Sequence, residues 1–187
     1  MMQSSTELNH GILEAVGKGN SDAFRILYLQ TSQTVYAYAL SILHNPQDAE
    51  DAMQDTFLKI REAAHLYQSR GKPMAWIFTI VRNVCLMKLR QQHREADHPA
   101  DTAKDEISFD RIENLENRMV LKAAMDVLDQ EEIQIILLHA VTGMKHREIS
   151  TLLEIPLSTV LSKYSRGLKK LRLRLEAPSC LTLAANK

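Results

Sequence analysis

The chain has 187 residues, and its 23 basic and 23 acidic residues give a formal net charge of zero. Its low Gly and Pro content favours an all-α fold with short breaks. No apolar run reaches the length of about 20 residues that crosses a membrane, and the two cysteines lack metal-ligand spacing. We also expect no signal peptide. We therefore expect a cytoplasmic protein without membrane insertion, metal or cofactor.

The charges are segregated along the chain. Acidic residues dominate positions 1–58, basic residues dominate 59–94, residues 95–117 are acidic again, and the C-terminal helix is basic. Zero net charge is unusual for a protein that binds nucleic acid by itself. Separate basic blocks nevertheless indicate two DNA-facing surfaces and at least one protein-facing surface. The alternative is that ordinary surface charges happen to cluster.

Three helices are predicted at the start of the chain. A short one is expected around residues 8–16. A longer one runs from residue 23 to 42, after an N-cap at Ser21 or Asp22 and before a break at His44, Asn45 and Pro46. The third begins at Pro46 with an acidic first turn that suits the helix dipole. Helical spacing gives it an inward apolar stripe of Ala49, Met53, Phe57, Ile60 and Ala64.

A second face of the third helix combines acids, an amide and one apolar residue. Its members are Asp48, Asp51, Gln54, Asp55 and Leu58. Two interpretations remain open for this face. The simpler one is the solvated start of a capped helix, and the more specific one is a docking face for a basic partner.

A basic loop and a mixed helix follow. Gly and Pro break the chain at residues 68–73, which include Arg70 and Lys72. The next helix spans residues 74–94, with Trp76, Ile80, Val84 and Leu86 or Met87 as core candidates and Cys85 as a small core residue. Its polar and cationic face carries Thr79, Arg82, Asn83, Lys88 and Arg90. Such a face beside a basic loop can hold an extruded base and the backbone of a single strand. The sequence is equally consistent with Trp76 as an ordinary core residue and with Trp76 as a residue that stacks on a base.

The middle of the chain separates two predicted domains. Residues 95–114 are acidic and lack a sustained apolar period, which predicts a flexible linker. Helical periodicity returns over residues 115–143, where two helices would support the element that follows. We therefore predict an N-terminal domain of residues 1–94, a C-terminal domain of residues 115–176 and a flexible tail of residues 177–187.

Residues 143–176 read as two helices joined by a tight turn at Glu154, Ile155 and Pro156. The residue before proline is pushed out of the α region, and proline suits the first turn of a new helix. The second helix has an apolar face of Leu157, Val160, Leu161, Tyr164, Leu168, Leu171 and Leu175. Its complementary face carries Thr159, Ser162, Lys163, Arg166 and Lys170. Hydroxyls that reach base edges and cations that meet phosphates suit a helix in the major groove. The alternative is a solvated amphipathic helix in an ordinary bundle.

Four stretches occur in a characteristic order. They are residues 20–28 (NSDAFRILY), 48–58 (DAEDAMQDTFL), 76–83 (WIFTIVRN) and 155–163 (IPLSTVLSK). They resemble, in turn, the opening helix, the polymerase-binding helix, the promoter-opening helix and the recognition turn and helix of one family. That family is the small two-domain extracytoplasmic-function (ECF) sigma factors of bacterial RNA polymerase. Each stretch alone is a weak signal, and four in this order are a specific one.

The resemblance implies a role for each matching face. The third helix, with Asp48, Asp51, Gln54, Asp55 and Leu58, would bind the clamp helices of the largest polymerase subunit. The loop at residues 68–73 and Asn83 would capture a flipped base of the minus-ten element. The opened strand would be held by Arg82, Lys88 and Arg90, while Arg70 and Lys72 belong to the loop that captures the base. The minus-thirty-five element would be read by Ser158, Thr159, Ser162, Lys163, Arg166 and Lys170.

The implied partners are core RNA polymerase, promoter DNA and an anti-sigma factor that buries these surfaces, with no small-molecule substrate. A single helix–turn–helix binds duplex DNA weakly, because non-specific dissociation constants are about 10⁻⁴–10⁻⁶ M. Recruitment by polymerase would raise the effective concentration of both modules. Five positions depart from the family pattern. Leu161 replaces a common Lys or Arg, Glu154 a common Gly and Asp129 a common Pro, and Ser165 and Leu168 are less basic or less bulky than usual. These changes bear on base preference and predict a weaker phosphate grip.

Three other classes of function are possible. A stand-alone helix–turn–helix regulator would bind duplex DNA without polymerase, and a decoy would bind only an anti-sigma factor. The basic block at residues 59–94 and the intact recognition helix argue against a decoy. An enzyme is disfavoured, because His93, His98, His139 and His146 form no ligand set and no Gly-rich phosphate loop exists.

Overall fold

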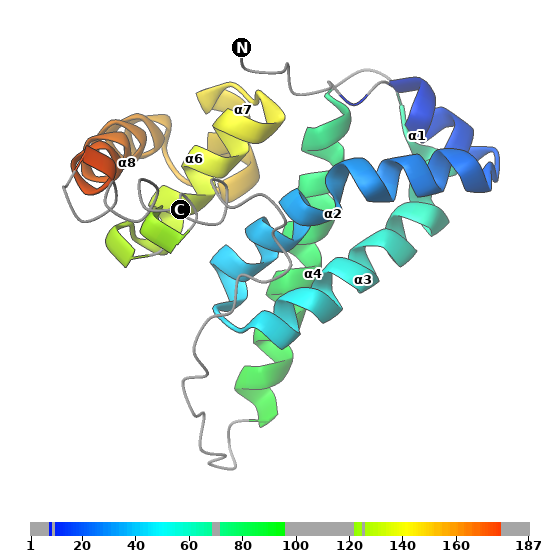
Figure 1. The fold of residues 1–187 in the computed structure, drawn as a ribbon, viewed down its shortest axis with the longest axis horizontal. Coiled ribbons are helices and arrows are strands. Elements are labelled where there is room, and N and C mark those ends of the chain that lie inside the picture. Colours follow the sequence, from blue (N-terminus) through cyan, green and yellow to red (C-terminus); the bar gives the residue numbers. More distant parts are fainter. Residues whose placement is uncertain (1–7, 9, 69–71, 96–121, 125, 177–187) are drawn as a thin grey trace, which may run out of the picture. The chain divides into compact units, whose positions relative to one another are not determined.

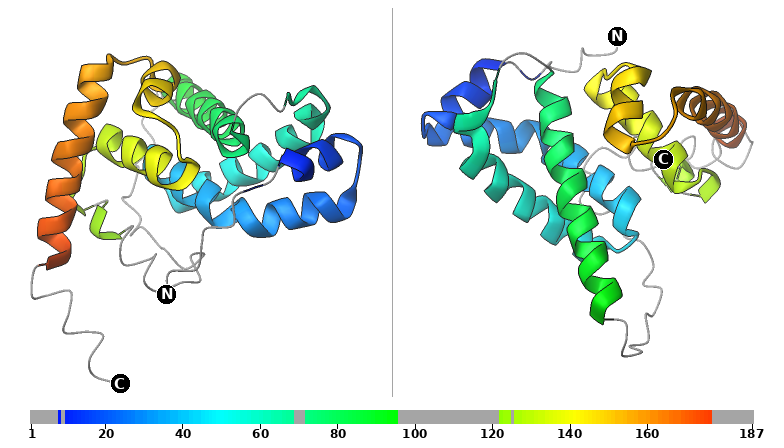
Figure 2. Two further views of the ribbon diagram at one scale, coloured as in Figure 1. Left: turned by 90° about the horizontal axis from the view of Figure 1, so that it is seen from above. Right: turned by 180° about the vertical axis from the view of Figure 1, so that it is seen from behind.

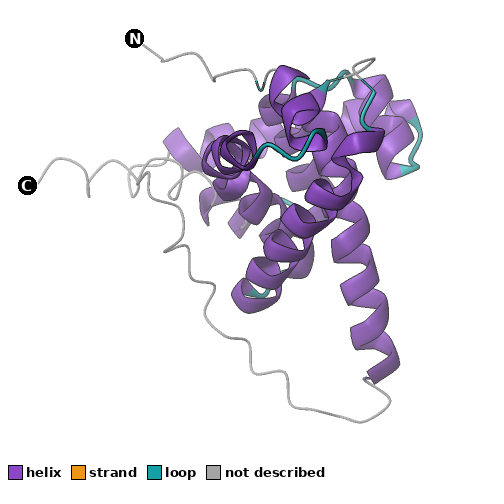
Figure 3. Cartoon of the chain, turned by 90° about the vertical axis from the view of Figure 1, so that its right-hand side faces the viewer, coloured by secondary structure: helices purple, strands orange, loops and turns teal. Residues whose placement is uncertain are grey.

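The regular structure of this chain is helical. The computed structural model describes residues 8, 10–68, 72–95, 122–124 and 126–176, and all regular elements in these ranges are helices (Figure 1 and Figure 3). The chain divides into two compact units, residues 1–107 and 108–187. Both findings confirm the predicted all-α class with two helical domains. The predicted tail and nearly all of the predicted linker lie outside the described residues, so the linker's flexibility and the domain limits stay predictions.

The described part of the N-terminal unit contains five helical elements. They are α1 (His10–Gly17), α2 (Ser21–Leu43), α3 (Pro46–Ala63), the short 3-10 helix η1 (Ala64–Leu66) and α4 (Pro73–Glu95). Asparagines begin the helices α2 and α3. The side-chain oxygen of Asn20 accepts the N–H of Ala23 at 2.9 Å, and Asn45 accepts those of Gln47 and Asp48 at 2.8 and 3.0 Å. The predicted N-cap of α2 at Ser21 or Asp22 is therefore one or two residues late.

The core of this unit lies where α2, α3 and α4 pack on one another. In Figure 1, α4 runs behind α2 and α3, and the right-hand view of Figure 2 shows it in front of them. The predicted inward stripe of α3 and η1 is confirmed, because Ala49, Met53, Phe57, Ile60 and Ala64 are all buried. Two aromatic rings of α2 reach the stripe: Phe24 and Tyr28 both contact the ring of Phe57.

The predicted core face of α4 is wrong in part. Trp76 and Ile80 are only half-buried and Met87 is 58% exposed. The buried residues of α4 are Ile77, Phe78, Val81, Val84 and Cys85, so the predictions for Val84 and Cys85 are confirmed. The first half of α4 is apolar on most sides, and its periodicity could not select a face. Contact with both α2 and α3 selects it instead.

The hydroxyl of Tyr38 is a buried polar group in an apolar core. Tyr38 is fully buried in α2 against the ring of Phe78, and its Oη has no hydrogen-bond partner among the described residues. Burial raises the pKa of this hydroxyl. We expect Tyr38→Phe to stabilise the N-terminal unit by about 1 kcal/mol, because an unpaired buried hydroxyl costs about 1–3 kcal/mol. Urea unfolding of both proteins measures the change, and a lower midpoint for the variant would contradict it.

The C-terminal unit holds the predicted helix–turn–helix. Its elements are α6 (Gln130–Thr142), α7 (His146–Leu153) and α8 (Leu157–Glu176), and residues 122–124 and 126–127 before them are also helical. Gly143 ends α6 at a φ of 64°, and Glu154 ends α7 at a φ of 58°. Both positions are left-handed, a conformation that glycine adopts more easily than glutamate.

The predicted apolar face of α8 is confirmed in part and wrong at two positions. Val160 is fully buried, but Leu161 and Leu168 are 47% and 40% exposed. The inward side is formed by the predicted residues Val160, Tyr164 and Leu171, of which the last two are half-buried, together with Gly167, which was not predicted. Gly167 lets α8 approach α6 closely, since a Cβ there would lie 2.9 Å from Cδ1 of Ile136. Hydrophobic periodicity could not detect this contact, because glycine carries no apolar signal.

Candidate nucleic-acid interface

The candidate docking face of α3 is partly exposed and partly tied to α4. Asp51, Gln54 and Leu58 are exposed, and Leu58 is 58% exposed. The other two predicted residues are half-buried and contact α4. The carboxylate of Asp48 accepts a hydrogen bond from Nε2 of Gln92 at 2.8 Å, and Asp55 lies 3.4 Å from Nζ of Lys88. The structure thus leaves an acidic face with an apolar centre open to solvent.

A groove between α3 and α4 gathers several of the predicted cations. Its lining is apolar at Val84 and Met87 and charged or polar at Asp55, Lys59, Lys88, Arg90, Gln91 and Arg94. Lys88 and Arg90 therefore share this groove. Arg82 is half-buried near Tyr38, and its charge acts against the raised pKa of that hydroxyl.

Asn83 and Arg90 lie together on an exposed face of α4. Both side chains are exposed, and they are seven residues apart, which places them on the same helix face two turns from each other. Lys72 is half-buried at the start of α4, and Arg70 lies outside the described residues. The predicted minus-ten set is therefore divided between the groove, the exposed face and the loop.

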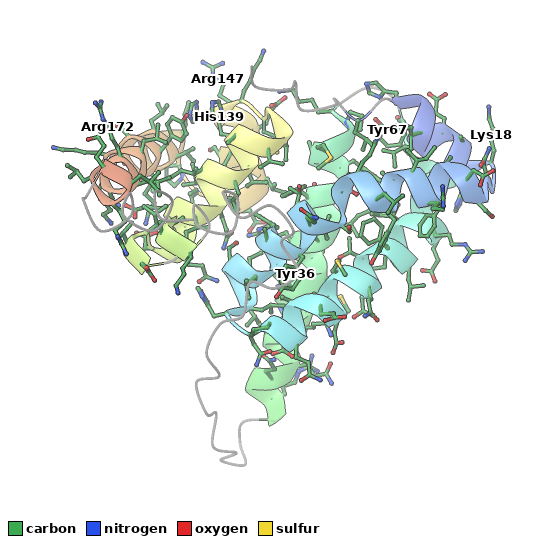
Figure 4. The ribbon with its side chains drawn as sticks, viewed as in Figure 1. Lys18, Tyr36, Tyr67, His139, Arg147 and Arg172 are labelled. Carbon is green, nitrogen blue, oxygen red and sulfur yellow. The ribbon has the colours of Figure 1, made fainter. Side chains whose placement is uncertain are left out.

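Aromatic side chains flank the basic loop at both ends. The ring of Tyr67, before the loop, packs edge-on against Trp76 of α4 with centroids 5.3 Å apart. His10 of α1 stacks on Tyr67, and Nδ1 of His10 lies 2.6 Å from the Tyr67 hydroxyl (Figure 4). Burial and the charge of Glu14 raise the pKa of Tyr67. Both ends of the loop are thus held together. Sequence reasoning missed His10, which carries no motif of its own.

The predicted minus-thirty-five set separates into two groups on α8. Ser158 and Ser162 are exposed at its start, and Thr159 is half-buried; the Ser162 hydroxyl donates to the Thr159 carbonyl at 3.0 Å. The cations Lys163, Arg166 and Lys170 instead bond to acids at the start of α6. Sequence reasoning missed these acids as partners.

The acids belong to the N-terminal cap of α6. Asp129 accepts the N–H of Glu132 at 2.8 Å, and Glu132 accepts the N–H of Asp129 at 3.0 Å, which is a capping box. Nζ of Lys163 lies 3.0 Å from Asp129 and 3.2 Å from Glu131. Nε of Arg166 lies 2.6 Å from Glu132, and Nζ of Lys170 lies 2.8 Å from it. We call these six residues the α6–α8 ion network.

The ion network sets the protonation of its members. Hydrogen bonds from Arg166 and Lys170 hold the pKa of Glu132 below its usual value although burial opposes them, and hydrogen bonds from the Glu132 N–H and Lys163 do the same for Asp129. The acids in turn raise the pKa values of Lys163 and Arg166. These shifts favour the charged forms of Asp129, Glu132, Lys163 and Arg166.

A histidine pair packs inside the helix–turn–helix. The rings of His139 on α6 and His146 on α7 stack with centroids 4.5 Å apart, and Tyr164 of α8 meets both edge-on. Nδ1 of His139 donates to the carbonyl of Met144 at 2.8 Å. Nε2 of His146 is buried without a partner among the described residues. Within those residues, no cluster of His, Cys, Asp and Glu is suited to hold a metal ion.

The histidine pair predicts a pH dependence. Burial, aided by His139, lowers the pKa of His146 below its usual value. The folded state therefore disfavours the protonated ring, so this stabilisation is present above about pH 6.5 and is lost as the pH falls through the lower folded pKa. We expect thermal unfolding of the C-terminal unit to shift to lower temperature from about pH 7 to pH 5, and His146→Phe to reduce that shift. An unchanged melting temperature in the wild type over this interval would contradict the prediction.

Comparison with known proteins identifies the family. Residues 27–95 match the model of Sigma-70 region 2, and residues 118–171 match that of Sigma-70 region 4. The ECF RNA polymerase sigma factor SigK of Mycobacterium ulcerans (strain Agy99) is 29% identical over 92% of this chain and 96% of that protein. The chain belongs to the ECF sigma factors. A further relative, the ECF RNA polymerase sigma factor SigX of Bacillus subtilis (strain 168), is 23% identical over 83% of this chain and 84% of that protein.

Solved structures share the fold of this ECF sigma factor. CnrH, in complex with the cytosolic domain of CnrY, matches with a TM-score of 0.58 and 21% identity over 90% of this chain and 97% of that chain. RpoE, in complex with the anti-sigma factor NepR from Bartonella quintana, matches with a TM-score of 0.60 and 23% identity over 83% of this chain and 98% of that chain. As an ECF sigma factor, the protein is a transcription initiation factor and not an enzyme. None of the helices in the described part of the chain combines the length and the apolarity that spanning a membrane requires.

Proposed function

We propose that this sigma factor binds core RNA polymerase through the exposed face of α3. Asp51, Gln54 and Leu58 form its centre, and Asp48 and Asp55 lie beside them. An exposed leucine among acids suits a partner with an apolar contact and a basic rim, because interface energy concentrates in a few buried apolar contacts while charges guide the encounter.

The minus-ten element is proposed to bind the loop before α4 and the exposed face of that helix. Asn83 offers both a donor and an acceptor to an extruded base. Arg90 lies on the same face two turns away, where it can contact the strand backbone, together with Arg70, Lys72, Arg82 and Lys88. The half-buried rings of Tyr67 and Trp76 fix the ends of the loop that receives the base.

The minus-thirty-five element is proposed to bind α8 in the major groove. Ser158, Thr159 and Ser162 lie in its first two turns, which is the part of a recognition helix that approaches base edges. A hydroxyl contact to a base adds only modest discrimination. Selectivity would therefore come from joining both modules on one polymerase, which raises their effective concentration at the promoter.

The proposal includes a place of action and an inhibitor. The protein would work in the cytoplasm, where RNA polymerase transcribes, and an anti-sigma factor would cover its working surfaces. Support for an inhibitor comes from the related fold of RpoE, which was solved with the anti-sigma factor NepR. The observation that carries the whole proposal is that both the region 2 and the region 4 models match, in order, on the two units that hold these faces.

The proposal is tested by measuring how well holoenzyme that contains the Asn83→Ala variant opens promoters. Holoenzyme assembled from core polymerase and the variant should bind promoter fragments but open at least tenfold fewer of them, as measured by permanganate reactivity of unpaired thymines. Gln30→Ala, an exposed amide on α2, is the matched control and should open promoters like the wild type. Equal opening by Asn83→Ala and the wild type would contradict the role of Asn83.

A further inference from the structure

The cations of α8 fall on two sides of the helix. Lys163, Arg166 and Lys170 are spaced three and four residues apart, which places them on one side, and that side faces the acids of α6. Lys169 and Arg172 lie on the side away from α6, in line with Ser158, Ser162 and Ser165. All five residues of this second row, which we call the outer row, are exposed.

The first group of cations is committed to the ion network. The side chain of Glu132 is 0% exposed, and its two oxygens are occupied by Nε of Arg166 and by Nζ of Lys170, the second oxygen also accepting the Asp129 N–H. If Arg166 moved to a phosphate, the buried carboxylate of Glu132 would lose the guanidinium that pairs with it, and this loss is strongly unfavourable. Lys163 is only 19% exposed between Asp129 and Glu131.

The backbone of α8 holds this arrangement in place. Gly167 lies between Arg166 and Lys170, and a Cβ at that position would be 3.4 Å from Cβ of Glu132. The two helices therefore meet at the network itself. Arg166 and Lys170 extend from α8 to a carboxylate directly beside the point of contact, so their release requires this contact to loosen.

The outer row has a different electrostatic character. Lys169 has no ion pair among the residues that the structure describes. Arg172 pairs with Glu176 at 2.8 Å, but both side chains are exposed, at 78% and 59%, and such surface pairs are weak (Figure 4). A phosphate can therefore attract both cations without exposing a buried charge.

We infer that Lys169 is the cation through which α8 holds the DNA backbone, with Arg172 as its neighbour, and that Arg166 and Lys170 are positioning residues that fix α8 on α6 through Glu132. This inference rests on the proposed binding of α8 to the minus-thirty-five element. It changes the roles within the predicted minus-thirty-five set, because only the hydroxyl residues of that set would contact DNA directly. It also adds Lys169, which that set lacked.

Salt dependence separates the two roles. Holoenzyme is assembled from core polymerase and the full chain, and its closed complex with a promoter fragment selected from a random library is titrated at several salt concentrations. Each phosphate contact contributes about 0.9 to the slope of log K against log salt. Lys169→Gln should lower the slope by about 0.9 and leave the melting temperature of the C-terminal unit unchanged. Lys122→Gln, an exposed cation of the same unit, is the control and should change neither value.

Arg166→Gln should show the opposite pattern: a lower melting temperature, partly restored by Arg166→Lys, with an unchanged salt slope. In a double-mutant cycle, Arg166→Gln and Glu132→Gln together should lower the melting temperature by less than the sum of the single changes. Three outcomes would overturn the inference. The salt slope could fall in Arg166→Gln, or it could stay unchanged in Lys169→Gln. The melting-temperature changes of Arg166→Gln and Glu132→Gln could also add fully in the double variant. A wild-type holoenzyme without promoter selectivity would instead overturn the proposed function, and the melting cycle would still test the positioning role.

Discussion

Replacing Ile149 with alanine is expected to unfold the C-terminal unit and leave the N-terminal unit folded. Ile149 is fully buried in α7, and α7 packs against both α6 and α8. Truncation of a buried isoleucine costs about 2–5 kcal/mol, because it removes apolar contacts and leaves a cavity. A small helical unit has a total stability of about 5 kcal/mol, so most of it would be lost.

Circular dichroism during heating, together with pull-down of core polymerase, measures this result. The variant should lose one of two unfolding transitions and its response to the minus-thirty-five sequence, yet retain polymerase binding through α3. Thr151→Ala on the exposed side of α7 is the matched control, with an expected change below about 0.5 kcal/mol. Loss of both units in one transition would contradict the independence of the two units.

Reversal of the α3 face is expected to abolish polymerase binding. Asp51 and Leu58 are seven residues apart, both are exposed, and neither contributes to the core. Arginine at both positions would replace an acid and an apolar group with two cations against a basic partner. Hot-spot contacts are worth about 2 kcal/mol or more, and 1.4 kcal/mol is tenfold in affinity, so we expect the dissociation constant to rise at least about 100-fold.

The control for this reversal uses the same pair of residue types on another helix. Asp22 and Leu29 are likewise seven residues apart and exposed on α2, and Asp22→Arg with Leu29→Arg makes the same change of charge and polarity. Fluorescence anisotropy with labelled core polymerase should show near wild-type affinity for this control. If both double variants lose affinity equally, net charge and not the α3 face explains the effect.

The sequence predicted those elements whose apolar pattern was confined to one stripe. The inward stripe of α3 and η1, from Ala49 to Ala64, alternates along the sequence with acidic and other polar residues. It is buried as expected. The start of α4 is apolar on nearly all sides, so periodicity placed Trp76 and Ile80 inward where Ile77 and Phe78 are buried. On α8 the pattern overlooked Gly167, because the close approach of two backbones leaves no hydrophobic signal in the sequence.

The candidate site was predictable in location but not in its pairings. The motif order pointed to α3, to α4 with its loop, and to α8, and family comparison confirms the sigma-factor assignment. The ion network was not predictable, because Glu132 and Arg166 are 34 residues apart in sequence. One signal was available: Asp129 followed three residues later by Glu132 is a capping-box pattern. Asp129 supplies both the N-cap of α6 and a partner of Lys163.

Run-off transcription tests the central claim most directly. Purified core polymerase is supplied with this protein and a library of random promoters, and the transcribed sequences are compared with those obtained from core polymerase alone. We predict enrichment of two separated elements at fixed spacing, with the downstream element lost in Asn83→Ala and the upstream element lost in Ile149→Ala. Transcripts from core polymerase that show no gain in promoter selectivity when the protein is added would contradict the account.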